Sequence, residues 1–332
     1  MFDALTRWGR STGSVDPVEG DAVPPLPKIG LVLGGGAARG WAHIGVLRAL
    51  TAAGYRPDVI AGTSIGAVVG GCYAAGKLDE LEDWARSLTK RRVFSLLDLS
   101  FTGTGILSGS RLRAALEKDL GALNIEDLPL GYVAIATEVA TGHEIWLTRG
   151  HLVEAMRASY ALPGIFEPVR IGGRWLIDGA LVNPVPVSAA RALGARMVVA
   201  VNLHADTYGR GAVVPSHGTD DDDLAALEQW RNHRQQPRFS GLRGRAAMRR
   251  TLKAHIDGAP GLPTVMNEAY NITQDRIARA RLAGDPPDVS VLPRLGQVGL
   301  FEFHRAAEAI ALGADAVERA LPDLVATSRT LT

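Results

Sequence analysis

The residues with the clearest chemical potential surround Ser64, in the stretch Gly62-Thr63-Ser64-Ile65-Gly66. An apolar run precedes this stretch and a run of small residues follows it, which predicts a serine on a sharp strand-to-helix turn. Such a turn exposes the serine Oγ at the end of a sheet, and Gly62 and Gly66 leave room across it. The pattern indicates a nucleophile, although a serine that only caps a helix would occupy the same place.

A second feature is the glycine-rich stretch GGGAARG at 34–40, between an apolar run and a predicted helix. A phosphate-binding loop would end in Gly-Lys-Ser/Thr, which is missing here. In a dinucleotide site, Gly34 and Gly36 would be followed by a third glycine where Arg39 stands. Two interpretations remain, an oxyanion hole beside the start of the helix near Gly40 and a tight turn without chemistry. Arg39 would hold the loop in place or attract an anionic group.

A serine hydroxyl needs a base before it can attack an ester at neutral pH. Asp178 follows an apolar run and precedes Gly179, which permits a sharp turn. One solution is a Ser-Asp-His triad, with Asp178 as the acid and His204 or His304 as the base. The other is a Ser-Asp dyad, in which a partly desolvated Asp178 accepts the proton directly. A turn-forming aspartate without chemistry would also fit.

The surrounding elements alternate between apolar runs and amphipathic segments, which predicts a mainly parallel sheet with helices on both faces. The predicted strands span 28–34, 57–63, 130–148 as a pair, 169–178 as a hairpin, 195–203 and 287–293. The predicted helices span 41–54, 64–76, 78–89, 109–120, 151–159, 187–194, 264–284 and 302–321. His43, within the first helix, is interpreted as structural support for the glycine loop.

The composition is that of a globular protein, with 332 residues, 46% hydrophobic, 21% charged and a net charge of +1. This charge argues against a general nucleic-acid binder, so no nucleic-acid partner is expected. Cys72 is the single cysteine, so no internal disulfide forms, and its apolar surroundings indicate a packing role. No stretch reaches the length of a membrane span and no secretory signal is evident, so a cytoplasmic location is expected, with peripheral membrane contact left open.

Two segments fall outside the alternating pattern. The composition of residues 1–27 predicts a flexible N-terminal arm. The domain itself is expected at 28–325. Residues 205–262 predict a polar and basic insertion, either a solvated surface loop or a lid that meets anionic lipid headgroups. Within it, Asp220 to Asp223 lack the ligand spacing and glycine of a calcium loop, so no metal site is expected.

Four motifs in order resemble those of the patatin-like phospholipase family: GGGAARG at 34–40, GTSIG at 62–66, ASYALPGIF at 158–166 and DGA at 178–180. The resemblance implies a three-layer α/β/α sandwich with a mainly parallel central sheet. It also implies a Ser64–Asp178 dyad, with Gly35, Gly36 and Ala37 as backbone oxyanion donors and Arg39 nearby. The implied reaction is hydrolysis of the acyl esters of lipids, without a metal or cofactor.

Three other functions remain open at this point. An acyltransferase could use the same serine with an alcohol as acceptor, and a Ser-Asp-His esterase could use one of the histidines. A regulatory protein could keep the scaffold without the chemistry. The sequence indicates no oligomeric state.

Overall fold

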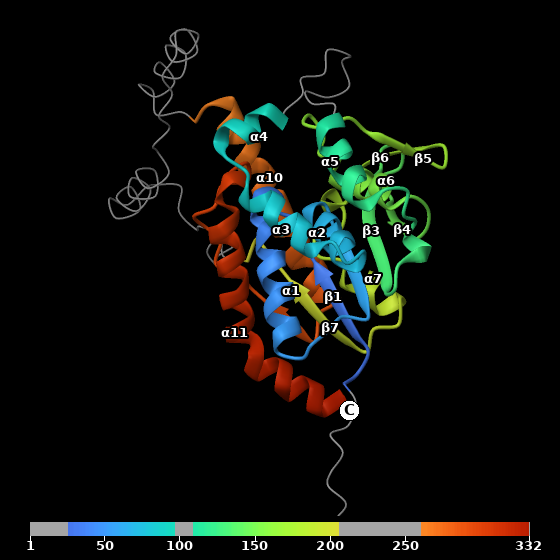
Figure 1. Ribbon diagram of the computed structural model, residues 1–332, viewed down its shortest axis with the longest axis vertical. Coiled ribbons are helices and arrows are strands. Elements are labelled where there is room, and N and C mark those ends of the chain that lie inside the picture. The colour runs from blue at the N-terminus through green and yellow to red at the C-terminus, as the bar shows by residue number, and fades with distance from the viewer. Residues whose placement is uncertain (1–25, 97–108, 206–259, 332) are drawn as a thin grey trace, which may run out of the picture.

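The computed structural model describes residues 26–96, 109–205 and 260–331 (Figure 1). Within these ranges the strands form one eight-stranded sheet in the order β5-β6-β3-β2-β1-β7-β8, with β4 paired to β3. The strands are β1 Ile29–Leu33, β2 Val59–Thr63, β3 Gly131–Glu138, β4 Glu144–Leu147, β5 Val169–Ile171, β6 Arg174–Asp178, β7 Met197–Val201 and β8 Val289–Val291.

The sheet is parallel through its centre and antiparallel at one edge. The run β3-β2-β1-β7-β8 is parallel, whereas β3 pairs with β4 and β6, and β5 with β6, in antiparallel fashion. The hairpins β3–β4 and β5–β6 produce this edge, because a short turn can join only antiparallel strands.

Strand β3 is longer than its neighbours, and this length lets two strands share one of its sides. Its residues 131–135 pair with β2, and its residues 136–138 pair with β6. Residues 134–137 pair with β4 as well, so β4 occupies the opposite side of β3 from both. The ends of β2 and β6 therefore meet end to end along one side of β3.

Helices cover both faces of the sheet. The α-helices are α1 Ala42–Ala52, α2 Ile65–Ala74, α3 Leu78–Arg86, α4 Lys90–Leu96, α5 Ser110–Leu120, α6 Leu152–Tyr160, α7 Val187–Ala192, α10 Leu262–Gly284 and α11 Ala306–Leu331. Short 3-10 segments are η1 Ala37–Trp41, η2 Ile125–Asp127, η3 Gly179–Leu181 and η4 Phe303–Arg305.

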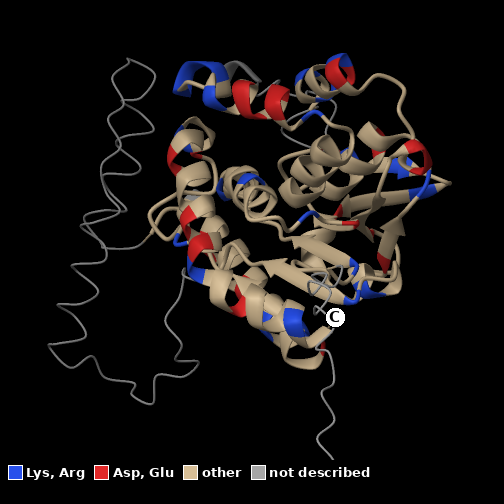
Figure 2. Ribbon diagram, turned by 60° about the horizontal axis from the view of Figure 1, so that its bottom comes forward, with Lys and Arg blue, Asp and Glu red and all other residues tan. Residues whose placement is uncertain are grey.

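Alternate residues of the central strands enter two separate hydrophobic cores. Leu31 and Leu33 belong to the larger core, with residues of α1, α2, α3, α5, α6 and α11 (Figure 1). Val32 belongs to the smaller core, with residues of α7 and α10. This alternation makes the three layers of an α/β/α sandwich, so the predicted fold class is confirmed. Positions of basic and acidic residues are interspersed along the outer helices (Figure 2).

Some predicted boundaries differ from the structure. The helix predicted at 302–321 begins with η4, and α11 then continues past Pro322 to Leu331. Proline usually ends a helix because it lacks an N–H, but Leu324 beyond it is fully buried in the larger core. The arm predicted for 1–27 and nearly all of the insertion predicted for 205–262 lie outside the described residues.

Long helices raise the question of membrane insertion. Among the described helices, none contains an apolar segment long enough to cross a bilayer.

The crossing of α1 and α11 leads to a stability prediction. A Cβ at Gly313 would lie 2.0 Å from the Ala42 carbonyl oxygen. Gly313→Ala must therefore push the two helices apart, and we expect a loss of about 1–3 kcal/mol in the free energy of unfolding. Gly284→Ala is the matched control, since a Cβ there meets nothing within 4 Å. Urea unfolding followed by circular dichroism measures both, and equal midpoints for the two variants would contradict the packing described.

Candidate active site

Ser64 occupies a strained turn between β2 and α2. Its backbone has φ 56° and ψ −124°, a region that residues other than glycine rarely adopt. A Cβ at Gly66 would lie 2.0 Å from the Leu33 carbonyl oxygen, and one at Gly62 would lie 2.5 Å from the Ala67 Cα. Both glycines are thus needed for the close approach of β1, β2 and α2, as the sequence pattern predicts.

The Ser64 side chain is hydrogen-bonded to Asp178. Its Oγ donates to Oδ2 of Asp178 at 2.7 Å, and the other carboxylate oxygen accepts the Ala180 N–H at 2.8 Å. Ser64 is 6% exposed and Asp178 only 1%. A hydroxyl and a carboxylate are therefore paired in a largely dehydrated site, which is the geometry of a nucleophile with its base.

The register of the sheet brings these two residues together. Thr63, the last residue of β2, pairs with Ile135 of β3, and Asp178, the last residue of β6, pairs with Ala136. Because β2 and β6 run in opposite directions relative to β3, their carboxyl ends meet at these adjacent positions. Ser64, the next residue after β2, consequently faces Asp178 across the junction.

Burial makes the Asp178 carboxyl group an unusually strong base. The pKa of Asp178 is raised from 3.8 to about 7, mainly because burial disfavours the charged form. The hydrogen bonds from Ser64 and from the Ala180 N–H oppose this rise. The group can therefore exchange a proton close to neutral pH, as a general base must.

Ser159, in the motif ASYALPGIF, supports the turn, a role that sequence reasoning missed. Its Oγ accepts the Ser64 backbone N–H at 2.8 Å and donates to the Ile135 carbonyl oxygen at 2.6 Å. Ser159 thereby ties the strained turn to β3 from α6. The sequence shows only a serine at the end of an amphipathic helix, and this pattern does not identify the groups to which the serine bonds.

The glycine loop passes directly beside Ser64. A Cβ at Gly35 would lie 3.6 Å from the Ser64 Cβ and 3.1 Å from the Ala180 Cβ. The Gly35 N–H donates to the Pro184 carbonyl oxygen at 3.0 Å, so this donor is already engaged within the fold. Among the described residues, the N–H groups of Gly36 and Ala37 have no hydrogen-bond partner. These two donors remain available to an oxyanion.

Several contacts hold the glycine loop in its conformation. The Gly34 N–H donates to the Val201 carbonyl oxygen at 3.1 Å, and the Gly34 carbonyl oxygen lies 2.8 Å from His43 Nε2. The latter contact agrees with the interpretation of His43 as structural support. Ala37 has φ 48°, so the loop carries a second non-glycine residue in a strained conformation. At the end of the loop, a Cβ at Gly40 would lie 2.2 Å from Ile65 Cγ2.

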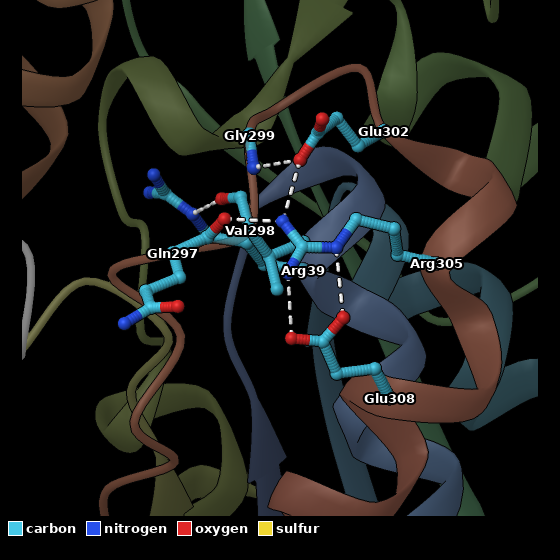
Figure 3. A network of polar contacts seen from close by, with 7 residues as sticks. All are labelled: Arg39, Gln297, Val298, Gly299, Glu302, Arg305 and Glu308. Atoms are coloured by element: carbon cyan, nitrogen blue, oxygen red, sulfur yellow. Dashed lines mark hydrogen bonds and ion pairs between the residues drawn. The ribbon is translucent and has the colours of Figure 1, made fainter. Parts of the chain in front are cut away.

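Arg39 anchors the loop rather than facing the serine. The side chain is 2% exposed, its Nε donates to the Val298 carbonyl oxygen at 2.8 Å, and its Nη1 donates to Asn271 Oδ1 at 3.2 Å. Figure 3 shows Arg39 reaching the segment before α11. Of the two roles predicted for Arg39, these contacts support holding the loop in place.

The segment that receives Arg39 is itself braced by ion pairs. Glu302 accepts the Gly299 N–H at 2.9 Å and pairs with Arg305 at 2.8 Å (Figure 3). Arg305 also pairs with Glu308 on α11 and donates to the Gln297 carbonyl oxygen. The glycine loop is thus connected through Arg39 to the beginning of the last helix.

The two histidines proposed for a triad lie elsewhere. His204 is buried beyond β7, and burial, with a smaller effect from Arg39, lowers its pKa to about 3. His304 lies in η4, where burial also lowers its pKa. The Asp178 carboxylate accepts its hydrogen bonds from Ser64 and Ala180, so among the described residues neither histidine bonds to the pair. The structure therefore brings together Ser64 and Asp178 without His204 or His304.

An apolar cavity of about 160 Å³ opens beside Ser64 and Asp178. Its walls come from α2, α3 and α5, from the segment that follows α6, and from the aromatic rings of Tyr270, Phe301 and Phe303. In the part of the chain that the structure describes, no cluster of three or more His, Cys, Asp or Glu side chains is arranged to hold a metal ion. The arrangement can bind an apolar group next to an activated hydroxyl.

Both the sequence and the fold of this chain were compared with those of known proteins. Residues 31–191 match the family described as Patatin-like phospholipase. An uncharacterized NTE family protein of Mycobacterium tuberculosis is 35% identical over 338 residues, covering 89% of this chain and 91% of that protein. Neuropathy target esterase sws of Drosophila melanogaster is 36% identical over 210 residues, covering 61% of this chain and 14% of that protein. The structure of VipD from Legionella pneumophila matches with a TM-score of 0.45 and 15% identity, covering 90% of this chain and 67% of that chain.

The buried carboxyl group leads to a prediction about stability and pH. Between 3.8 and about 7, the folded protein keeps the Asp178 proton and the unfolded chain releases it. The wild-type free energy of unfolding therefore falls as pH rises through this interval. Asp178→Asn lacks this dependence, so we expect it to be more stable than wild type above about pH 7, by up to about 4 kcal/mol, and equally stable near about pH 4.

Urea unfolding at a series of pH values measures this difference. Ser64→Ala is the control, because it keeps the carboxyl group and removes only a hydrogen bond that lowers its pKa. The control should therefore show the same fall in stability with rising pH, extended to a somewhat higher pH than in wild type. Parallel curves for wild type and Asp178→Asn across the whole interval would show that Asp178 does not titrate as described.

Proposed function

Because the chain belongs to the patatin-like phospholipase family, we propose that it is a serine acyl hydrolase that cleaves carboxylic ester bonds of lipids. Its relatives' names point to lipid ester hydrolysis in general, and the finer assignment depends on the site. The observation that carries it is the hydrogen bond of 2.7 Å from the Ser64 Oγ to Asp178, in a strained turn beside an apolar cavity.

In the proposed acylation step, the Ser64 Oγ attacks the acyl carbonyl carbon while Asp178 accepts the hydroxyl proton. The carbonyl oxygen becomes an oxyanion, which the N–H groups of Gly36 and Ala37 and the positive end of α2 stabilise. Gly35, expected as a third donor, contributes instead to the shape of the loop, because its N–H is bonded to Pro184. The intermediate collapses, the leaving alkoxide takes the proton from Asp178, and an acyl-serine ester remains.

In the proposed deacylation step, water attacks the acyl-serine ester and Asp178 accepts a proton from it. The second oxyanion forms at the same two N–H groups, and Ser64 leaves as it recovers the proton from Asp178. The fatty acid is released and the dyad is restored. A pKa of about 7 suits this cycle, because Asp178 must both accept and return a proton.

Two alternatives use the same scaffold. An acyltransferase would pass the acyl group from Ser64 to an alcohol instead of water, and the dyad geometry is compatible with both acceptors. A regulatory protein would not need a hydroxyl paired with a carboxylate whose pKa is matched to proton transfer. Product analysis with an added acceptor alcohol separates transfer from hydrolysis, and labelling of Ser64 by a serine-reactive probe separates an enzyme from a binder.

Removal of the nucleophile tests the proposal directly. Ser64→Ala should abolish hydrolysis of p-nitrophenyl acyl esters and of phospholipids, because it removes the hydroxyl that forms the proposed acyl intermediate. In the wild type, kcat/KM should rise with pH and level off above about 7, since only ionised Asp178 acts as a base. Unchanged turnover in Ser64→Ala, with an unaltered circular dichroism spectrum, would refute the assignment.

Histidine variants distinguish the dyad from a triad. His204→Ala and His304→Ala should retain most of the wild-type kcat, because neither residue bonds to Ser64 or Asp178. Asp178→Asn provides the comparison and should reduce kcat by at least about 10²-fold, since general-base catalysis contributes about that much. If either histidine variant loses kcat as severely while remaining folded, the triad is correct.

A further inference from the structure

The cavity follows one face of α2 away from the serine. Ile65, Val68 and Cys72 of this helix line it, and their spacing places all three side chains on one face. Ser64 stands at the beginning of the same helix. With a rise of about 1.5 Å per residue, Cys72 lies about 12 Å along the helix from Ser64. The cavity wall therefore extends along α2 from Ser64 to Cys72.

The opposite wall is equally apolar. Leu81 and Trp84 of α3 and Leu116 of α5 line the cavity across from α2. Trp84 packs edge-to-face against Trp41, with 5.9 Å between ring centroids, which fixes this part of the wall. A flexible hydrocarbon chain fits a channel of this kind, whereas a polar leaving group would lose its hydration there.

The channel changes character at its far end. Lys77 and Glu80, at the junction between α2 and α3, and Asp119 of α5 line it there. Lys77 and Glu80 form an ion pair at 2.7 Å, with side chains 39% and 43% exposed. Methylene groups that reach these charges are no longer transferred from water to an apolar environment, so the gain from burial stops there.

We infer that this channel holds the acyl chain of the substrate and that its charged far end, at Lys77 and Glu80, sets the preferred chain length, with Cys72 on the wall before that end. The inference rests on the proposed function, since the acyl carbonyl must be at Ser64. The ten residues of α2 correspond to a channel of about 15 Å, which accommodates about 10–12 methylene carbons in extended form. The preferred substrates are accordingly esters with a single medium-length acyl chain in this site.

The channel predicts a dependence of rate on chain length. Each methylene group buried contributes about 0.8 kcal/mol, equivalent to about a fourfold rise in kcat/KM. For p-nitrophenyl esters of straight-chain acids, measured below their aggregation concentrations, kcat/KM should therefore rise with each added carbon. The rise should stop at about 10–12 carbons, where the chain reaches Lys77 and Glu80.

Two enlarged side chains on α2 test the geometry. Cys72→Phe should end the rise at about 8–9 carbons, and Val68→Phe, one turn closer to Ser64, at about 4–5 carbons. In both variants kcat/KM should fall far more for the long-chain esters than for the acetyl ester, because the acetyl chain reaches neither position. Cys72→Ala is the matched control, because it removes the thiol without narrowing the channel, so its rise in kcat/KM should not end at a shorter chain than in wild type.

The results distinguish this inference from the proposed function. A wild-type kcat/KM that stays constant from 4 to 12 carbons would overturn the inference. This measurement uses the wild-type protein alone, so it does not depend on whether a variant folds. Equal losses at all chain lengths in folded Cys72→Phe and Val68→Phe would also overturn it. In either case, loss of acetyl ester hydrolysis in Ser64→Ala still supports the hydrolase. Activity that survives in Ser64→Ala would instead remove the proposed function itself.

Discussion

The meeting of two strand ends along one side of β3 is the constraint on which the rest of the site depends. Residues 131–135 of β3 pair with β2 and residues 136–138 pair with β6, which arrives from the opposite direction. Only a strand longer than its partners can place a parallel and an antiparallel neighbour in succession. The serine that follows β2 and the aspartate that ends β6 are thereby held within hydrogen-bonding distance, with no flexible segment between them and the sheet.

Burial then changes the acid–base properties of the carboxyl group placed there. An aspartate in water is too weak a base for a serine hydroxyl, and the same carboxyl group, desolvated at the junction, has a pKa of about 7. Burial of this carboxyl group lowers the stability of the fold, and the hydrophobic cores on both faces of the sheet offset that loss. The strained backbone of Ser64 is maintained in a similar way, through Ser159 on one side and the close contact of Gly66 with β1 on the other. Reactivity and strain at the site are both supported by the surrounding packing.

The glycine loop shows how distant parts of the chain contribute to one small site. The fold uses its N–H groups at Gly34, Gly35, Ala38 and Arg39. This leaves the N–H groups of Gly36 and Ala37 with no protein partner among the described residues. Arg39 fastens the loop to Val298 and Asn271, which come from the last third of the sequence. The proposed oxyanion site therefore depends on α10 and on the segment before α11, although neither Ser64 nor Asp178 lies in them.

The sequence by itself determined the chemical types and the local turns. The glycines at 62 and 66, the apolar runs and the Asp-Gly pair at 178 identify a serine turn, a sandwich of alternating elements and a candidate acid, because these depend on neighbours along the chain. It left open whether His204, His304 or neither completes the site, and it assigned three oxyanion donors where Gly35 is already engaged. It also ended the last helix before Pro322, since the burial of Leu324 is not local information. Only the tertiary structure carries information on these points, because strand register selects the residues that meet and burial raises the pKa of the Asp178 carboxyl group.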